Sequence, residues 1–198
     1  MSLQVAPLRS AVIVRSTAMT SALLIVGGIS FLALLAQISI PVPGSPVPVT
    51  GQTLGVLIIG TTYGTLLGTS TFALYLLAGV LGAPIFAPSE TLPSYGIARL
   101  TSATGGYLVG MLLATLLLGY LAERRADQKF KTSYLALLAG TAIIFIFGVS
   151  WLKISLDMSW SAAIAAGFTP FILGEALKIA ITATSLPLVW RKLSKRLS

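Results

Sequence analysis

The sequence contains no cysteine and no histidine, and only 9% of its 198 residues are charged. The chain therefore has no disulfide, no thiolate or imidazole metal ligand, and no thiol- or histidine-based catalytic centre. Because a soluble domain carries about 25% charged residues, this composition argues against a water-exposed globule. The sequence also lacks the glycine-rich G-x-x-x-x-G-K-[ST] segment of Walker ATP sites. We expect no catalytic site, no bound metal and no cofactor.

Long apolar segments take the place of the missing polar residues: 56% of the residues are hydrophobic and the mean hydropathy is +0.94. A membrane-spanning helix needs about 20 mostly apolar residues, and continuous apolar runs favour helices over alternating strands. We predict an all-α, single-domain membrane bundle (1–198) of six transmembrane helices, at about 17–39, 50–62, 64–82, 105–122, 133–151 and 168–190. The second helix is too short to cross the full thickness of the membrane alone, so it is tilted, shortened or partly re-entrant.

Most of the basic residues lie in three segments of the chain. Ten of the 13 cations precede the first predicted helix, separate the fourth from the fifth, or follow the sixth: Arg9, Arg15, Arg124, Arg125, Lys129, Lys131, Arg191, Lys192, Lys195 and Arg196. Six spans put these segments on one side, and the positive-inside rule makes that side the cytoplasm. We therefore predict that both termini are cytoplasmic, and we interpret the net charge of +8 as a topology signal and not as a nucleic-acid interface.

The opposite side carries proline-rich connections. The loop after the first helix holds Pro41, Pro43, Pro46 and Pro48 within eight residues. Because proline fixes its own φ and restricts the preceding residue, four prolines favour a preformed extended segment. The loop either covers a pocket as a lid or simply ends the helix.

Two opposite charges lie inside the sixth predicted helix, in the segment Gly-Glu175-Ala-Leu-Lys178. Residues three apart share one helix face, and an ionisable group near the centre of a membrane helix costs about 2.5–3.5 kcal/mol. Such groups usually pair and face a cavity. Three interpretations follow from the residues alone: the pair binds a polar ligand, relays a proton, or only stabilises packing.

Four further residues on the proline-rich side are candidates for ligand binding. Arg99 and Tyr107 flank the start of the fourth helix, where an arginine beside a helix N-terminus suits a carboxylate; alternatively, Arg99 is a solvated loop charge. Gln52 and Thr53 begin the second helix, where they either cap it or line a pocket.

Several motifs together resemble the BioY family, the biotin-binding S components of energy-coupling-factor (ECF) transporters. They are Pro-Val-Pro-Val-Thr-Gly-Gln-Thr-Leu-Gly-Val (46–56), Tyr-Leu-Leu-Ala-Gly-Val-Leu-Gly-Ala-Pro-Ile-Phe-Ala (75–87), Thr-Gly-Gly-Tyr-Leu-Val-Gly (104–110) and Gly-Phe-Thr-Pro-Phe-Ile-Leu-Gly-Glu-Ala-Leu-Lys (167–178). The resemblance runs from the first helix to the last. It departs from the family at Glu175, where the family usually has Asp, and at Ser102-Ala103, where it usually has Gly-Pro.

The resemblance implies a compact six-helix protein of a prokaryotic cell membrane, with a biotin pocket that faces outward and is closed by the proline loop. By the same resemblance, Glu175 and Lys178 bind the ureido end of biotin and Arg99 binds its carboxylate, with Tyr107 beside it. Gln52 and Thr53 would then line the lid.

The resemblance also implies partners. Ala18 and Ala22, one turn apart on the first helix, would contact the transmembrane coupling subunit, and two separate ATPase subunits would supply the energy. An alternative that the residues leave open is a self-sufficient ion-coupled symporter of biotin or a small carboxylate. A weaker alternative is a membrane structural protein without a ligand.

Overall fold

A computed structural model describes residues 7–12, 17–89 and 92–197, and most of them are helical. Arg15, one of the predicted topology cations, lies outside these ranges. The elements in chain order are α1 (Leu8–Val12), α2 (Ala18–Gln37), β1 (Ser39–Ile40), β2 (Val49–Thr50), α3 (Gln52–Tyr63), α4 (Thr65–Val80), α5 (Ala98–Thr101), α6 (Gly105–Glu123), α7 (Phe130–Ser155), α8 (Trp160–Gly167), a 3₁₀ turn η1 (Thr169–Phe171) and α9 (Ile172–Leu197).

Helices lie within all six predicted ranges, with different ends. α7 continues to Ser155, beyond the predicted end at 151, and α8 lies in the connection between the fifth and sixth predicted helices. α9 begins four residues later than predicted, after η1, and continues through Pro187 to Leu197. Where we expected no strands, a short antiparallel pair joins Ser39 to Thr50 and Ile40 to Val49.

α3 and α4 form a bent pair whose corner is held by α6. Gly64 separates them with φ of +80°, a conformation that favours glycine. The Glu123 carboxylate at the end of α6 accepts hydrogen bonds from the Thr65 backbone N–H and hydroxyl, both at 2.8 Å, and so caps α4. A Cβ on Gly119 would lie 2.5 Å from the backbone of this corner, so glycine allows the close approach.

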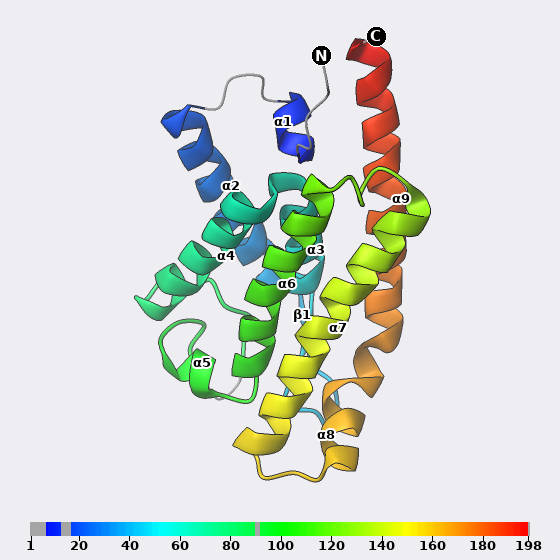
Figure 1. Cartoon of the computed structure of the whole chain (residues 1–198). Coiled ribbons are helices and arrows are strands. Elements are labelled where there is room, and N and C mark those ends of the chain that lie inside the picture. The colour runs from blue at the N-terminus through cyan, green and yellow to red at the C-terminus, as the bar shows by residue number, and fades with distance from the viewer. Residues whose placement is uncertain (1–6, 13–16, 90–91, 198) are drawn as a thin grey trace.

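α6 and α7 pack against each other at the centre of the bundle (Figure 1). Small residues permit this contact: a Cβ on Gly110 would lie 2.9 Å from the Ile144 Cα, and one on Gly148 would lie 2.3 Å from the Tyr107 ring. Close approach through small residues is typical of helices in membranes, where dispersion and not the hydrophobic effect drives association. This packing brings Tyr107 into the centre of the protein.

The outer surface of the bundle is apolar. Large apolar side chains such as Leu23, Leu66, Ile146 and Leu173 are mostly exposed, which suits contact with lipid and not with water. Four helical stretches are long and apolar enough to cross a membrane, namely Ala18–Gln37, Gly105–Glu123, Phe130–Ser155 and Trp160–Lys195, and Thr65–Val80 is a shorter apolar helix. The chain is therefore a multi-pass membrane protein.

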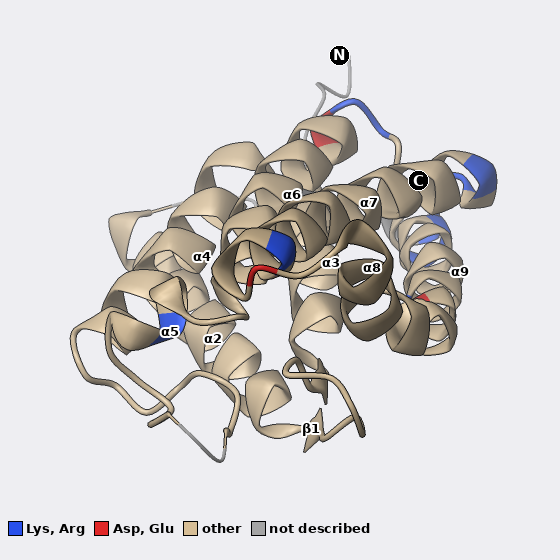
Figure 2. Ribbon diagram, turned by 90° about the horizontal axis from the view of Figure 1, so that it is seen from below, with Lys and Arg blue, Asp and Glu red and all other residues tan. Residues whose placement is uncertain are grey.

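The two ends of the bundle differ in structure. One end, here called the basic end, consists of α1, the 124–129 loop and the C-terminal part of α9 (Figure 1). Lysines and arginines gather there, at the 124–131 segment and the end of α9 (Figure 2). The other end, here called the pocket end, consists of the 41–48 loop, the 83–89 loop, α5 and α8, and contains the candidate site.

Candidate functional site

A cavity of about 60 Å³ lies within the bundle near the pocket end. Its walls come from α3, α6, α7 and the η1–α9 segment, and the 41–48 and 83–89 loops close it. The walls are mostly apolar and aromatic: Val47, Pro48, Phe86, Ala87, Leu108, Met111, Ile144, Phe145 and Phe171. The polar or charged lining residues are Thr50, Gln52, Thr53, Arg99, Thr104, Tyr107 and Glu175.

The predicted charge pair exists and is buried against the start of α3. Lys178 Nζ lies 2.6 Å from Glu175 Oε1, and their side chains are 13% and 6% exposed. Thr53 links the two, since its hydroxyl donates to Glu175 Oε1 at 2.7 Å and accepts from Lys178 Nζ at 2.7 Å. Lys178 also donates to the backbone oxygen of Thr50 at 2.7 Å. α9 is thus bound to residues more than 120 positions earlier in the chain.

The two members of the pair have different roles in this geometry. The three acceptors of Lys178 use all three of its N–H donors, and Lys178 does not line the cavity. Glu175 lines the cavity, and its Oε2 is buried with no hydrogen-bond partner among the residues that the structure describes. A buried unsatisfied carboxylate oxygen is costly. The site therefore presents a strong acceptor to any ligand that carries N–H or O–H donors.

Gln52 and Thr53 reach the cavity because the strand pair sets the start of α3. The Gly51 N–H donates to the Ile38 oxygen at 2.9 Å, next to the β1–β2 pairing. A Cβ on Gly51 would lie 2.8 Å from the Leu35 backbone oxygen, so only glycine fits there. The first turn of α3 is thereby held over the cavity, and both side chains are buried in its wall.

Arg99 belongs to α5 and is only 4% exposed, so the interpretation of Arg99 as a solvated loop charge is wrong. Its guanidinium donates to the Ala87 backbone oxygen, which ties α5 to the 83–89 loop. Burial lowers the pKa of Arg99 from its ordinary value, and the nearby Tyr75 opposes that shift. An arginine guanidinium stays protonated in proteins, so Arg99 places a positive charge at the edge of the cavity.

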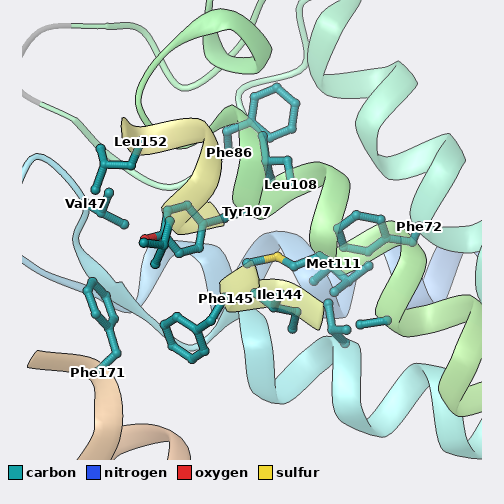
Figure 3. Close-up of a cluster of buried hydrophobic side chains, with 14 of the residues drawn as sticks. Val47, Phe72, Phe86, Tyr107, Leu108, Met111, Ile144, Phe145, Leu152 and Phe171 are labelled. Atoms are coloured by element: carbon teal, nitrogen blue, oxygen red, sulfur yellow. The ribbon is translucent and has the colours of Figure 1, made fainter. Parts of the chain in front are cut away.

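Two glycines make room for the Tyr107 side chain. Its ring lies against Gly148, and its hydroxyl donates to the Gly167 oxygen at 2.7 Å, where a Cβ on Gly167 would clash with it. Figure 3 shows Tyr107 among Phe145, Phe171 and Val47, which come from separate elements. Because the hydroxyl proton is engaged, Tyr107 can offer only its lone pairs and its ring to a ligand.

A second, outer cavity of about 670 Å³ adjoins the first. The two share Pro48, Arg99 and Thr104, which therefore stand between them. The proline loop forms one side of the outer cavity, and the Ser45 hydroxyl binds it to the Ala166 oxygen of α8 at 2.8 Å. Val47 and Pro48 of this loop also line the inner cavity.

Six of the eight residues singled out from the sequence meet in one place: Gln52, Thr53, Arg99, Tyr107 and Glu175 line the cavity and Lys178 lies behind them. Ala18 and Ala22 lie elsewhere, exposed in the first turns of α2. The start of α2 points toward the basic end (Figure 1). The aromatic wall of Phe86, Phe145 and Phe171 was not predicted from the sequence. Two of these lie in the quoted motifs, at Pro-Ile-Phe86 and Pro-Phe171, but apolar residues in an apolar chain carry no local signal of a pocket.

The fold and the site define a class of protein: a multi-pass membrane bundle with an aromatic cavity that suits a small, partly polar molecule and is lined by the carboxylate of a buried ion pair. The sequence model of the BioY family matches residues 8–195, and the chain belongs to that family.

Relatives agree with this assignment, and a solved structure shares the fold. The biotin transporter BioY2 of Lactococcus lactis subsp. cremoris is 36% identical over 182 residues, covering 88% of this chain and 93% of that protein. The biotin transporter BioY of Thermotoga maritima is 32% identical over 160 residues, covering 81% of this chain and 90% of that protein. The fold is similar to the crystal structure of an S-component for biotin from an ECF-type ABC transporter, with a TM-score of 0.78, 20% identity, and coverage of 89% and 95% of the two chains.

Proposed function

We propose that this protein is the biotin-binding membrane subunit of a vitamin uptake system and that its cavity holds biotin. The observation that carries the proposal is the free carboxylate oxygen of Glu175 in the cavity wall. The ureido group of biotin has N–H donors for such an acceptor, and the apolar walls suit the remainder of its ring system. The protein is a transporter subunit and not an enzyme.

Arg99 is the proposed partner of the biotin carboxylate. It lines both the inner and the outer cavity, whereas Glu175 lines the inner one and not the outer one. A ligand with N–H donors at one end and a carboxylate at the other suits these two residues. Its donors then meet the Glu175 carboxylate, and its carboxylate meets the Arg99 guanidinium. Lys178 acts on the ligand through Glu175 and Thr53, both of which it binds.

Binding requires the outer wall to move. Ligand pockets usually have volumes of roughly 300–1,000 Å³, whereas the inner cavity holds about 60 Å³ and the outer one about 670 Å³. Pro48, Arg99 and Thr104 separate the two, so we propose that the 41–48 loop opens to join them and closes over the bound ligand.

The proposed topology has six spans, with α3 and α4 as short ones, and both termini in the cytoplasm of a prokaryotic cell. The cations of the basic end support this orientation through the positive-inside rule. The pocket end then faces outward, where the substrate arrives.

The proposed partners are a transmembrane coupling subunit and two ATPase subunits on separate chains. The exposure of α2 supports a partner subunit. Only 11% of its most apolar 18-residue stretch is buried within the protein, against 61% for α6. Ala18 and Ala22 are exposed on this helix, where small side chains permit close approach of a second helix. Replacing both with leucine should abolish coupled uptake and leave biotin binding unchanged.

Calorimetric titration of the purified protein in detergent with biotin tests the proposal, with desthiobiotin and lipoate as competitors. Saturable biotin binding, displaced by desthiobiotin, which keeps the ureido group, and not by lipoate, which lacks it, is the expected result. No saturable binding would overturn it. Biotin uptake into proteoliposomes distinguishes the symporter alternative from ATPase-driven transport. If proteoliposomes that contain only this protein accumulate biotin when a proton gradient is imposed, the symporter mechanism is established.

A further inference from the structure

Tyr75 lies behind the binding site and not in it. It belongs to α4, is fully buried and does not line the cavity. Its hydroxyl makes two hydrogen bonds: it donates to the Ile85 backbone oxygen at 2.8 Å and lies 3.1 Å from Gln52 Nε2. One residue thus connects the start of α3 with the 83–89 loop.

These two hydrogen bonds determine which way the Gln52 amide points. A tyrosine hydroxyl has one proton, and Ile85 can only accept it. The hydroxyl therefore accepts from its other neighbour, and the amide nitrogen of Gln52 must face Tyr75. The amide oxygen is then turned away from Tyr75, on a side chain that lines the cavity.

The same tyrosine also positions the 83–89 loop. The Tyr75 ring meets Phe86 edge-on, with centroids 5.6 Å apart, and Phe86 lies over Gly79 so closely that a Cβ there would fall 2.3 Å from its ring. Phe86 and Ala87 both line the cavity. The loop that carries them is thus attached to α4 by Tyr75 and to α5 by Arg99.

We propose that Tyr75 is a positioning residue for biotin, which orients Gln52 so that its amide oxygen, together with Glu175 Oε2, accepts the N–H donors of the ureido ring. This inference rests on the proposed function. The ureido ring has two N–H donors. The Gln52 amide oxygen and the Glu175 carboxylate oxygen supply one acceptor for each, which explains why the cavity combines an amide with a carboxylate. Tyr75 itself touches no ligand.

A double-mutant cycle on biotin affinity tests the inference. Tyr75→Phe removes only the hydroxyl and should weaken biotin binding about tenfold, since Gln52 loses the group that orients it. Gln52→Met should weaken binding at least as much, and Tyr75→Phe combined with Gln52→Met should bind no more weakly than Gln52→Met alone. The matched control is Tyr63→Phe, which removes a hydroxyl bound to the Leu24 oxygen outside the cavity, and should leave affinity unchanged.

A second measurement is independent of whether Tyr75→Phe folds. A biotin derivative methylated on a ureido nitrogen should bind the wild-type protein at least tenfold more weakly than biotin. In Gln52→Met this penalty should shrink, because the acceptor is already lost.

The outcomes separate this inference from the proposed function. Wild-type affinity in Tyr75→Phe, additive losses in the cycle, or an undiminished methylation penalty in Gln52→Met would each overturn the role of Tyr75 while biotin binding stands. Failure of the wild-type protein to bind biotin would overturn both.

Discussion

Two carboxylates are buried at opposite ends of this protein, and their surroundings differ. Glu175, near the pocket end, has an ammonium and a hydroxyl on Oε1 and lines a cavity with Oε2. Asp127, in the loop at the basic end, is 1% exposed and accepts from the Trp190 indole N–H at 2.5 Å. Its other oxygen is buried with no hydrogen-bond partner in the described part of the chain.

The difference separates the proposed binding carboxylate from a structural one. Burial raises the pKa of Asp127 to about 6, and the hydrogen bond from Trp190 opposes that rise only in part. Its bond to Trp190 attaches the 124–129 loop to α9. At Glu175 the charge of Lys178 compensates for burial, and the free oxygen faces a space that a ligand can fill. A buried unpartnered oxygen therefore indicates a binding site only where a cavity and a counter-charge accompany it.

The largest expected effect is from Glu175→Gln. The amide would keep its oxygen toward Lys178 and Thr53 and place its nitrogen at the Oε2 position, where a donor then faces the ligand's donors. Biotin affinity should fall by at least about 2 kcal/mol, roughly 30-fold, in a titration of the purified variant. Glu175→Asp, which keeps the charge, should lose less. Unchanged affinity in folded Glu175→Gln would make the pair structural, like Asp127.

Removing the Lys178 ammonium tests the role of the counter-charge beside Glu175. Lys178→Met leaves Glu175 buried without its counter-charge, so both biotin affinity and the unfolding temperature should fall, the affinity by about 2 kcal/mol. Combining Lys178→Met with Glu175→Gln should cost less than the sum of the single losses, because the uncompensated charge is gone. Additive losses would show that the two residues act separately.

Arg99 should have a smaller and more selective effect. Arg99→Gln should weaken biotin binding by about 1.4 kcal/mol, or tenfold, since a charge-assisted hydrogen bond to the carboxylate is lost. The wild-type preference for biotin over biotin methyl ester should disappear in this variant. Equal losses for acid and ester would mean that Arg99 only holds the 83–89 loop through Ala87.

Asp127 should affect stability and not binding. An acid whose pKa is higher in the folded state stabilises the fold when protonated, and this contribution is lost as the pH rises through about 6. The wild-type unfolding temperature should therefore be higher at about pH 5 than at about pH 7.5, by about 1 kcal/mol or 2–4 °C. Asp127→Asn should remove that part of the pH dependence and leave biotin affinity unchanged. An identical pH profile in the variant would contradict this.

Much of the helical content followed from local patterns. α6, found at Gly105–Glu123, lies almost where its apolar run predicts it, at 105–122. The less regular elements could not be predicted from local patterns, because they depend on contacts with residues distant along the chain. η1 delays the start of α9, α8 is only eight residues long, and the β1–β2 pair forms beside the start of α3.

The sequence by itself determined that the chain is an apolar membrane protein and that Glu175 and Lys178 share a helix face, since hydropathy and helical spacing are local properties. Only the tertiary structure decided what those charges do. Thr50 and Thr53 use the donors of Lys178 across more than 120 residues, which leaves Glu175 Oε2 as the free group. Such pairing depends on how α3 packs against α9, and no local pattern encodes it.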